Sequence, residues 1–334
     1  MQEHLTSKSP SRCPSTNSAP SWVQALGSVA MNFWVTYPLI AHPYNPELLT
    51  KEALTKFCVA AEDAGFAGIG FTDHPAPTER WLQAGGHDAL DPFTALAFCA
   101  AVTDRLRLIP NILVLPYRNP FLVAKAAATL DVLSGGRFTL SAATGYLRGE
   151  YQALGVDFEQ RNALFDEAIE VILGIWSEND FAHQGLTFTA KGQTANPKPD
   201  PHPPIWIGGN SRASRRRVAR YGNGWNPFPA PQQLAQTAKS ARLETVDDLR
   251  AMLDELWQFV ETAGRDPAEI DVSFGSSAGG DPGKEKFNGG AQLEAVEELR
   301  ALGVTWSGIG VPGDSLDHAI EALQRFSASV IRAR

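Results

Sequence analysis

A histidine follows an aspartate at the end of an apolar run, in Thr72-Asp73-His74-Pro75. Histidine exchanges a proton near neutral pH, so it suits acid–base chemistry. The proline favours an extended backbone at the residue before it, so we expect His74 to be extended. Asp73 and His74 are therefore candidates for a proton-transfer site. The structural alternative is an Asp-His pair that only ties down a loop.

Polar residues also interrupt or follow two other apolar runs. Asn111 lies inside the run that continues to Leu115, where a buried amide is costly unless it finds hydrogen-bond partners. That residue predicts either a structural bond or a ligand contact. Thr144, Gly145 and Tyr146 follow a later run, and such small residues let a flat ligand approach the backbone, while the tyrosine presents a hydroxyl. Tight packing is the alternative for this segment.

A glycine pair separates an apolar run from a helical pattern in Ile205-Trp206-Ile207-Gly208-Gly209-Asn210-Ser211. Asn210 or Ser211 can cap the helix, and the free amides of its first turn can bind an anion. Gly208 and Gly209 are therefore candidates for a phosphate-binding turn. The helix that follows carries Arg212, Arg216 and Arg220 on one face, which predicts either a solvated face or contact with an anionic cofactor tail.

Short apolar runs alternate with longer helical patterns from residue 29 onward, which is typical of parallel β/α units. Helix signals fall in the gaps, such as Asn119 before Pro120 and Asp91 before Pro92. The predicted strands span residues 29–36, 67–72, 106–113, 138–142, 204–207, 224–226, 270–274 and 304–309.

Eight parallel strands with right-handed crossovers close into a barrel more naturally than into an open sheet. We therefore expect an α/β fold, a (β/α)8 TIM barrel with insertions after strands at its C-terminal face; an open doubly wound sheet is the alternative. In such a barrel, residues just after the strands meet at one mouth. The glycine turn follows the fifth strand, whereas barrel phosphate sites usually follow the seventh and eighth.

Three segments interrupt the repeat, at residues 177–203, 227–244 and 275–290, and the first holds a predicted hairpin around His183 to Phe188. These segments predict lids over a ligand or plain surface loops. Residues 29–334 form one predicted barrel domain. Residues 1–28 are rich in Ser, Pro and Thr, which predicts a disordered extension.

The whole-chain numbers narrow the class of partner. The formal net charge of −8 argues against a general nucleic-acid or anionic-membrane binder, because those proteins gather phosphates with a positive field. Cys13, Cys58 and Cys99 fit no metal-ligand or disulfide pattern, so we expect no metal site and a cytoplasmic protein. No apolar stretch is long enough for a transmembrane helix. A small-molecule partner is the expectation.

Several motifs together resemble the bacterial luciferase-like monooxygenase superfamily, and within it the coenzyme F420-dependent oxidoreductases. The resemblance runs from about Met31 to the last helix. The motifs are Thr72-Asp73-His74-Pro75 and residues 111–120, 128–137, 148–155, 204–211 and 221–225.

The resemblance implies a barrel that holds the cofactor ring across its mouth, with the phosphate at Gly208, Gly209 and Asn210. It places Asp73 and His74 beside the ring, with the histidine in proton transfer or substrate activation. It further implies a cis peptide between Asn111 and Ile112 behind the ring, and cofactor contacts at Thr144 and Gly145. One position departs from the family: Tyr146 stands where its sugar-phosphate and alcohol dehydrogenases carry a glutamate. A tyrosine donates a hydrogen bond but is a poor acid at pH 7.

Three functions follow as hypotheses. The first is hydride transfer between coenzyme F420 and a small organic substrate, with His74 as the proton-transfer group and Tyr146 as a second catalytic candidate. The second is an FMN-dependent monooxygenase that uses reduced flavin and dioxygen. The third is a non-catalytic barrel that binds flavin. The family resemblance also implies a homodimer.

Overall fold

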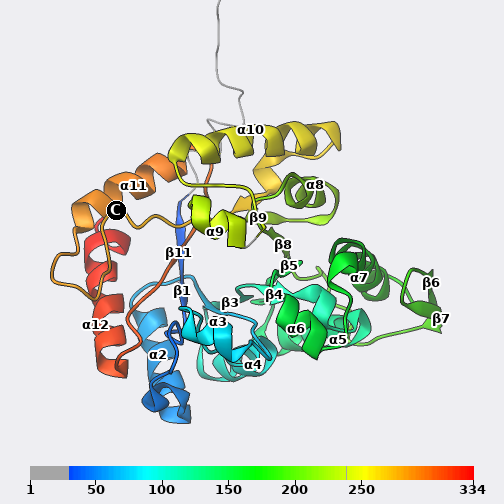
Figure 1. The fold of residues 1–334 in the computed structure, drawn as a ribbon, viewed down its shortest axis with the longest axis horizontal. Helices are drawn as coiled ribbons and strands as arrows, with labels where there is room; N and C mark the ends of the chain where they lie inside the picture. The colour runs from blue at the N-terminus through cyan, green and yellow to red at the C-terminus, as the bar shows by residue number, and fades with distance from the viewer. Residues whose placement is uncertain (1–29, 238) are drawn as a thin grey trace, which may run out of the picture.

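The computed structural model describes residues 30–237 and 239–334. The disordered extension expected over residues 1–28 lies outside the described residues. Parallel strands occupy eight positions around a central barrel, and helices surround it (Figure 1). One position is shared by β3 (Arg107–Pro110) and β4 (Leu113–Val114). The other seven are occupied by β1 (Asn32–Thr36), β2 (Gly68–Phe71), β5 (Leu140–Ala143), β8 (Ile205–Gly208), β9 (Gly224–Asn226), β10 (Asp271–Val272) and β11 (Trp306–Ile309).

Two parallel sheets share this barrel, in the orders β11-β1-β2-β3 and β10-β9-β8-β5-β4. Single parallel bridges join their edges, between Leu108 and Phe138 and between Ser273 and Trp306. The predicted closed barrel is therefore confirmed, and the open doubly wound sheet is wrong. The third predicted strand, 106–113, is not continuous, because the backbone turns at Asn111 and Ile112 between β3 and β4.

Helices follow most of the strands and begin at the predicted caps. The side chain of Asn119 accepts a hydrogen bond from the amide of Phe121, and that of Asp91 accepts one from Thr94. The helices are α2 (Lys51–Asp63), α3 (Glu79–Gln83), α4 (Pro92–Val102), α5 (Pro120–Ser134), α6 (Arg148–Ala153), α7 (Arg161–Ser177), α8 (Arg212–Tyr221), α9 (Gln232–Thr237), α10 (Val246–Thr262), α11 (Gly289–Ala301) and α12 (Leu316–Phe326). Shorter helical turns are η1 (Pro46–Leu49), η2 (Leu115–Tyr117), η3 (Phe158–Gln160), η4 (Pro267–Glu269) and η5 (Ser327–Ile331).

The three predicted insertions have different structures. The first contains the antiparallel hairpin of β6 (Phe181–Gln184) and β7 (Thr189–Gln193), which projects past α7 at the right of Figure 1. The second carries α9, and its two ends pair through the antiparallel bridge of Ala230 with Leu243. The third is anchored by Gln292 of α11, whose buried side chain accepts from the amide of Gly279 and donates to the carbonyl of Ser276.

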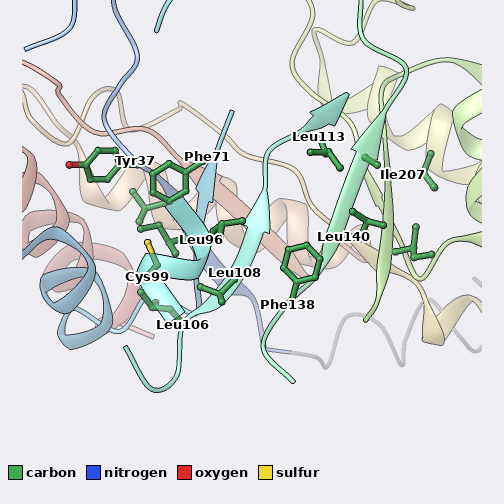
Figure 2. Close-up of a cluster of buried hydrophobic side chains, with 14 of the residues drawn as sticks. Tyr37, Phe71, Leu96, Cys99, Leu106, Leu108, Leu113, Phe138, Leu140 and Ile207 are labelled. Atoms are coloured by element: carbon green, nitrogen blue, oxygen red, sulfur yellow. The ribbon is translucent and has the colours of Figure 1, made fainter. Parts of the chain in front are cut away.

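The hydrophobic core has an outer layer and an inner one. The outer layer lies between strands and helices, and Figure 2 shows Leu108, Phe138 and Leu140 on adjacent strands of it. The inner layer fills the barrel with the side chains of Trp34, Ile109, Trp206 and Trp306. Glycines make room for these large rings: a Cβ on Gly308 would lie 2.3 Å from the indole of Trp34.

Candidate active site at the barrel mouth

One large cavity of about 1220 Å³ lies at the carboxyl ends of the strands. Its wall combines residues from strand ends far apart in the sequence, as the convergence of a β/α barrel requires. The structure places every predicted site residue in this wall. These residues are Asp73, His74, Asn111, Ile112, Thr144, Gly145, Tyr146, Gly208, Gly209 and Asn210.

The glycine turn lies between β8 and α8 and faces the cavity. Gly209 has φ +94°, in the left-handed region that favours glycine. A Cβ on Gly208 would lie 2.0 Å from Cδ1 of Ile112, so a larger residue here displaces a neighbour in the cavity wall. Ser211 caps α8 by accepting from the amide of Ser214. The remaining amides of the first turn have no partner within the helix, which suits an anion.

Asn210 contributes to this turn through its backbone rather than its side chain. The side-chain oxygen of Asn210 accepts from the amide of Phe228, and its amide group donates to the carbonyls of Phe228 and Ala241. The side chain is fully buried. Asn210 therefore fixes the base of the α9 insertion beside the cavity, a role that the sequence did not indicate.

His74 contacts a buried carboxylate that sequence reasoning missed. Nδ1 of His74 lies 3.2 Å from Oε2 of Glu150, which also accepts from the hydroxyl of Tyr117 at 3.1 Å. The amide of Ala76 donates to Oε1 of Glu150. A carboxylate only accepts, so the proton on His74 lies on Nδ1, and Nε2 is left for a ligand. Glu150 is 1% exposed and lies behind the imidazole rather than in the cavity wall.

Aromatic rings enclose His74 on its other sides. The ring centroids of Trp81 and His87 lie 4.6 Å and 5.0 Å from that of His74, and the Tyr146 ring lies at 6.3 Å. Burial lowers the pKa of His87, which keeps this neighbour neutral at pH 7. Burial, reinforced by the charge of Glu150, raises the pKa of Tyr146. Tyr146 is therefore a hydrogen-bond donor throughout the neutral range.

Asp73 ties the segment after β3 to the strand end. Its Oδ1 accepts from Nη2 of Arg118 at 2.7 Å, and its Oδ2 accepts from the amide of Val114 at 2.9 Å. Arg118 also contacts Asp91, the cap of α4. Both carboxylate oxygens of Asp73 are thus used within the protein, which matches the structural alternative for this residue.

Amide and hydroxyl groups form a buried network below the cavity. Nδ2 of Asn226 donates to Oδ1 of Asn111 at 3.1 Å and to Oγ of Ser141 at 3.2 Å. The network gives Asn111 the partner that a buried amide requires. The peptide between Asn111 and Ile112 is cis, as the resemblance implied. Asn226 closes β9, and only its place at a strand end could have indicated it.

The arginines of α8 are used in ion pairs rather than in the cavity. Arg212 pairs with Glu255 at 2.8 Å, and Arg220 pairs with Glu170 at 2.9 Å. Neither arginine lines the cavity, and Arg212 and Arg220 are 62% and 66% exposed, which agrees with a solvated face. Within residues 30–237 and 239–334, no cluster of His, Cys, Asp and Glu could hold a metal ion. In the same residues, no helix has the length and apolar character needed to cross a bilayer.

Comparison with known proteins gives a consistent family. A family model described as luciferase-like monooxygenase matches residues 31–279. The F420-dependent glucose-6-phosphate dehydrogenase of Beutenbergia cavernae is 28% identical over 270 residues, covering 80% of this chain and 74% of that protein. The FMNH2-dependent dimethylsulfone monooxygenase of Pseudomonas putida is 36% identical over 125 residues, covering 36% of this chain. This match spans only 34% of that monooxygenase.

Solved structures with low sequence identity have the same fold. The monooxygenase RslO1 from Streptomyces bottropensis has a TM-score of 0.75 at 18% identity, covering 91% of this chain and 99% of that one. An F420-dependent secondary alcohol dehydrogenase has a TM-score of 0.69 at 15% identity, with the same coverage. These two likenesses support the barrel and say nothing of the substrate.

Proposed function

Because this chain belongs to the luciferase-like monooxygenase family, we propose that it transfers a hydride between coenzyme F420 and a small organic substrate. The observation that carries this proposal is the fixed imidazole of His74 in the cavity wall, with Nδ1 bound to Glu150 and Nε2 left for a ligand. Both types of relative, the F420-dependent dehydrogenase and the FMNH2-dependent monooxygenase, are oxidoreductases.

The residues of the cavity fit a flavin-type cofactor. The cavity of about 1220 Å³ exceeds the range of about 300–1,000 Å³ that is usual for one small ligand, so it has room for a cofactor and a substrate. The amide of Gly209 donates to the carbonyl of Asn226, so the backbone amides of Ser211 and Ala213 would hold the phosphate at the start of α8. Thr144, Gly145 and Ile112 would contact the ring. When bound, the deazaflavin supplies the carbon centre that accepts or donates the hydride.

The protein itself would supply orientation and one proton. For an alcohol substrate, Nε2 of His74 accepts the hydroxyl proton as the hydride leaves the adjacent carbon, and it returns that proton in the reverse direction. Glu150 stabilises the imidazolium that this transfer forms, because the carboxylate lies beside Nδ1. The hydroxyl of Tyr146, protonated in the neutral range, would donate a hydrogen bond to the substrate oxygen.

The length of the matches supports F420 over FMN. The dehydrogenase aligns over 80% of this chain, whereas the sulfone monooxygenase aligns over 36%. An FMN-dependent monooxygenase is the second candidate, because that shorter match has the higher identity. A non-catalytic flavin-binding barrel is the third, and it requires a bound cofactor without turnover.

Two variants of the 334-residue protein test the proposal. Gly208→Val should abolish cofactor binding, because its side chain displaces Ile112 into the cavity, whereas His74→Ala should keep binding and lose turnover about 100-fold. The measurement is fluorescence titration with F420 and, separately, with FMN, followed by steady-state turnover with small alcohols.

Tight binding of FMN without binding of F420 would overturn the cofactor assignment. Full activity in His74→Ala would remove the histidine from the mechanism. Leu186→Ala, in the distant β6–β7 hairpin, is the control and should leave both binding and turnover unchanged.

We also propose that the protein is a homodimer that pairs through α5. Leu122, Val132 and Leu133 on this helix are 70%, 53% and 75% exposed. Apolar side chains so exposed on one helix favour a partner surface. A cytoplasmic location remains a prediction from the cysteine content.

A further inference from the structure

Two cations line the cavity at a place that the glycine turn does not explain. Arg161 begins α7, and Lys239 follows α9 in the second insertion; both are cavity residues. Each approaches the ring of Phe158, with Cζ of Arg161 4.0 Å and Nζ of Lys239 5.3 Å from the ring centroid. Two segments far apart in the sequence thus bring positive charge to one side of the cavity.

These charges are only weakly compensated within the protein. Nη1 of Arg161 donates to the carbonyl of Phe158 at 2.8 Å, and its carboxylate partner, Glu159, lies at 4.0 Å and is 67% exposed to solvent. A salt bridge in water at this distance contributes little. By contrast, Arg217 of α8 is 9% exposed, and its Nε lies 2.6 Å from Oδ1 of Asp166. Apart from His74, Arg161 and Lys239 are the basic side chains among the described residues that line the cavity.

Neutral donors lie beside the two cations. Asn162 and Ser240 also line the cavity, each next in sequence to one of the cations. The side-chain oxygen of Asn162 accepts from Arg217 at 3.2 Å. The amide nitrogen of Asn162 is therefore the atom that can donate to a ligand. A pair of cations with an amide and a hydroxyl suits an anionic group such as a phosphodiester or a carboxylate.

We propose that Arg161 and Lys239 form a second anion subsite, which binds a negatively charged extension of the cofactor beyond the phosphate at the glycine turn. This inference rests on the proposed function. FMN ends at one phosphate, which the glycine turn already accommodates. Coenzyme F420 continues through its phosphodiester into a tail of carboxylates, so it has the charge that this subsite requires. The subsite thus selects cofactors by their tail rather than by their ring.

Three probes with the same deazaflavin ring test the subsite, in the absence of substrate. They are the ring with its ribityl chain alone, the 5′-phosphate of that compound, and F420 with its full tail. Fluorescence titration of the 334-residue protein should give an affinity for F420 that falls about tenfold in Arg161→Gln/Lys239→Gln. The affinities for the two shorter probes should stay unchanged, and Arg161→Lys should recover part of the loss.

Arg148→Gln is the matched control. Arg148 also approaches Phe158, at 4.1 Å, but it pairs with Glu159 at 2.6 Å and does not line the cavity. This variant should bind all three probes as the parent protein does. Added salt should weaken binding of F420 more in the parent protein than in the double variant.

Failure of the subsite and failure of the proposed function give different results. If the parent protein binds F420 and the double variant binds it equally well, the subsite does not exist. If the double variant loses the 5′-phosphate probe to the same extent, the cations act on the first phosphate, and the inference is also wrong. If the parent protein binds FMN but none of the deazaflavin probes, the proposed function fails instead.

Discussion

Glu150 contacts the imidazole of His74 at Nδ1 and leaves Nε2, the nitrogen that faces a ligand, without a protein partner in the described residues. Glu150 takes Nδ1, and Tyr117 and Ala76 hold the carboxylate in place. A histidine constrained in this way presents the same nitrogen to every ligand. Glu150 is therefore a positioning residue, since it contacts His74 and not the cavity.

Glu150→Gln should lower kcat at least tenfold, to about the extent that a misaligned proton-transfer group costs, with little change in the affinity for F420. The amide offers both a donor and an acceptor to Nδ1, so the ring no longer has one defined tautomer. Nitrogen-15 NMR of the imidazole checks this directly: it should show one Nδ1-protonated form in the parent protein and a mixture in the variant.

Tyr117→Phe is the matched control for that experiment. It removes one donor to Oε2 of Glu150 and leaves the carboxylate in place, so His74 should keep its tautomer. A single tautomer in Glu150→Gln, together with unchanged kcat, would contradict the positioning role.

Among single residues, those that directly follow strands are predictable from the sequence, and those that hydrogen-bond to them from other elements are not. His74, Tyr146 and Gly208 were predictable because a barrel brings strand ends to one mouth. Glu150 lies on the short helix α6, and no local pattern states that α6 packs against the end of β2. Asn210 was predictable as part of the turn before α8. The hydrogen-bond partners of its side chain were not, because they lie in an insertion without a recognisable pattern.

At the scale of elements, α2 is tied to the segment that enters β3. Glu62, near the end of α2, accepts from the amides of Asp104, Arg105 and Leu106. Burial opposes ionisation of this side chain, but the three backbone donors outweigh it and lower the pKa of Glu62 below its usual value. The carboxylate of Glu62 thus fixes the backbone that leads into β3.

Glu62→Gln should therefore lower the free energy of unfolding at pH 7 by about 1–3 kcal/mol. A carboxyl whose pKa is lowered in the folded state stabilises the fold above its unfolded pKa, and this contribution disappears as the pH falls through the folded pKa. The stability gap between parent and variant should therefore narrow as the pH falls below the usual pKa of a glutamate. Urea unfolding followed by circular dichroism measures it.

Glu52→Gln, on the exposed face of the same helix, is the control and should behave like the parent protein at every pH. A gap between the parent protein and Glu62→Gln that stays constant from neutral to acidic pH would show that Glu62 acts by packing rather than by charge.

The elements themselves were largely predictable, since strand runs and helix caps are local signals. The errors were local as well. Apolar residues recur at helical spacing over residues 46–64, which predicts one helix. The structure divides this segment into η1 and α2, because Thr50 is extended and caps α2 through the amide of Ala53. The predicted strand 106–113 breaks at Asn111, whose side chain belongs to the polar network with Asn226 rather than to a ladder.

At the scale of the whole molecule, the proposed homodimer pairs through the exposed leucines of α5. Leu122→Glu/Leu133→Glu should convert a dimer into a monomer, because two carboxylates cannot be desolvated in an apolar interface. Sedimentation velocity measures the mass. Leu186→Glu, on the exposed hairpin, is the control and should leave the assembly unchanged. A monomeric parent protein would contradict the proposed homodimer.

Barrel closure followed from counting eight strand runs, and the cavity followed from closure. The distribution of charge around the cavity did not follow, because it depends on which of many basic residues already has a partner. The sequence drew attention to α8, where Arg212 and Arg220 form ion pairs, and not to Arg161 and Lys239.

The tryptophans that fill the barrel have a kinetic consequence. Trp34 forms part of the cavity wall, and Trp206 and Trp306 pack with it in the barrel interior. A packed barrel is a floor and not a pore. Everything that enters the site must therefore leave by the same opening, so the molecule that binds deepest arrives first and departs last. We therefore expect that a cofactor bound against this floor enters before the substrate and leaves after it.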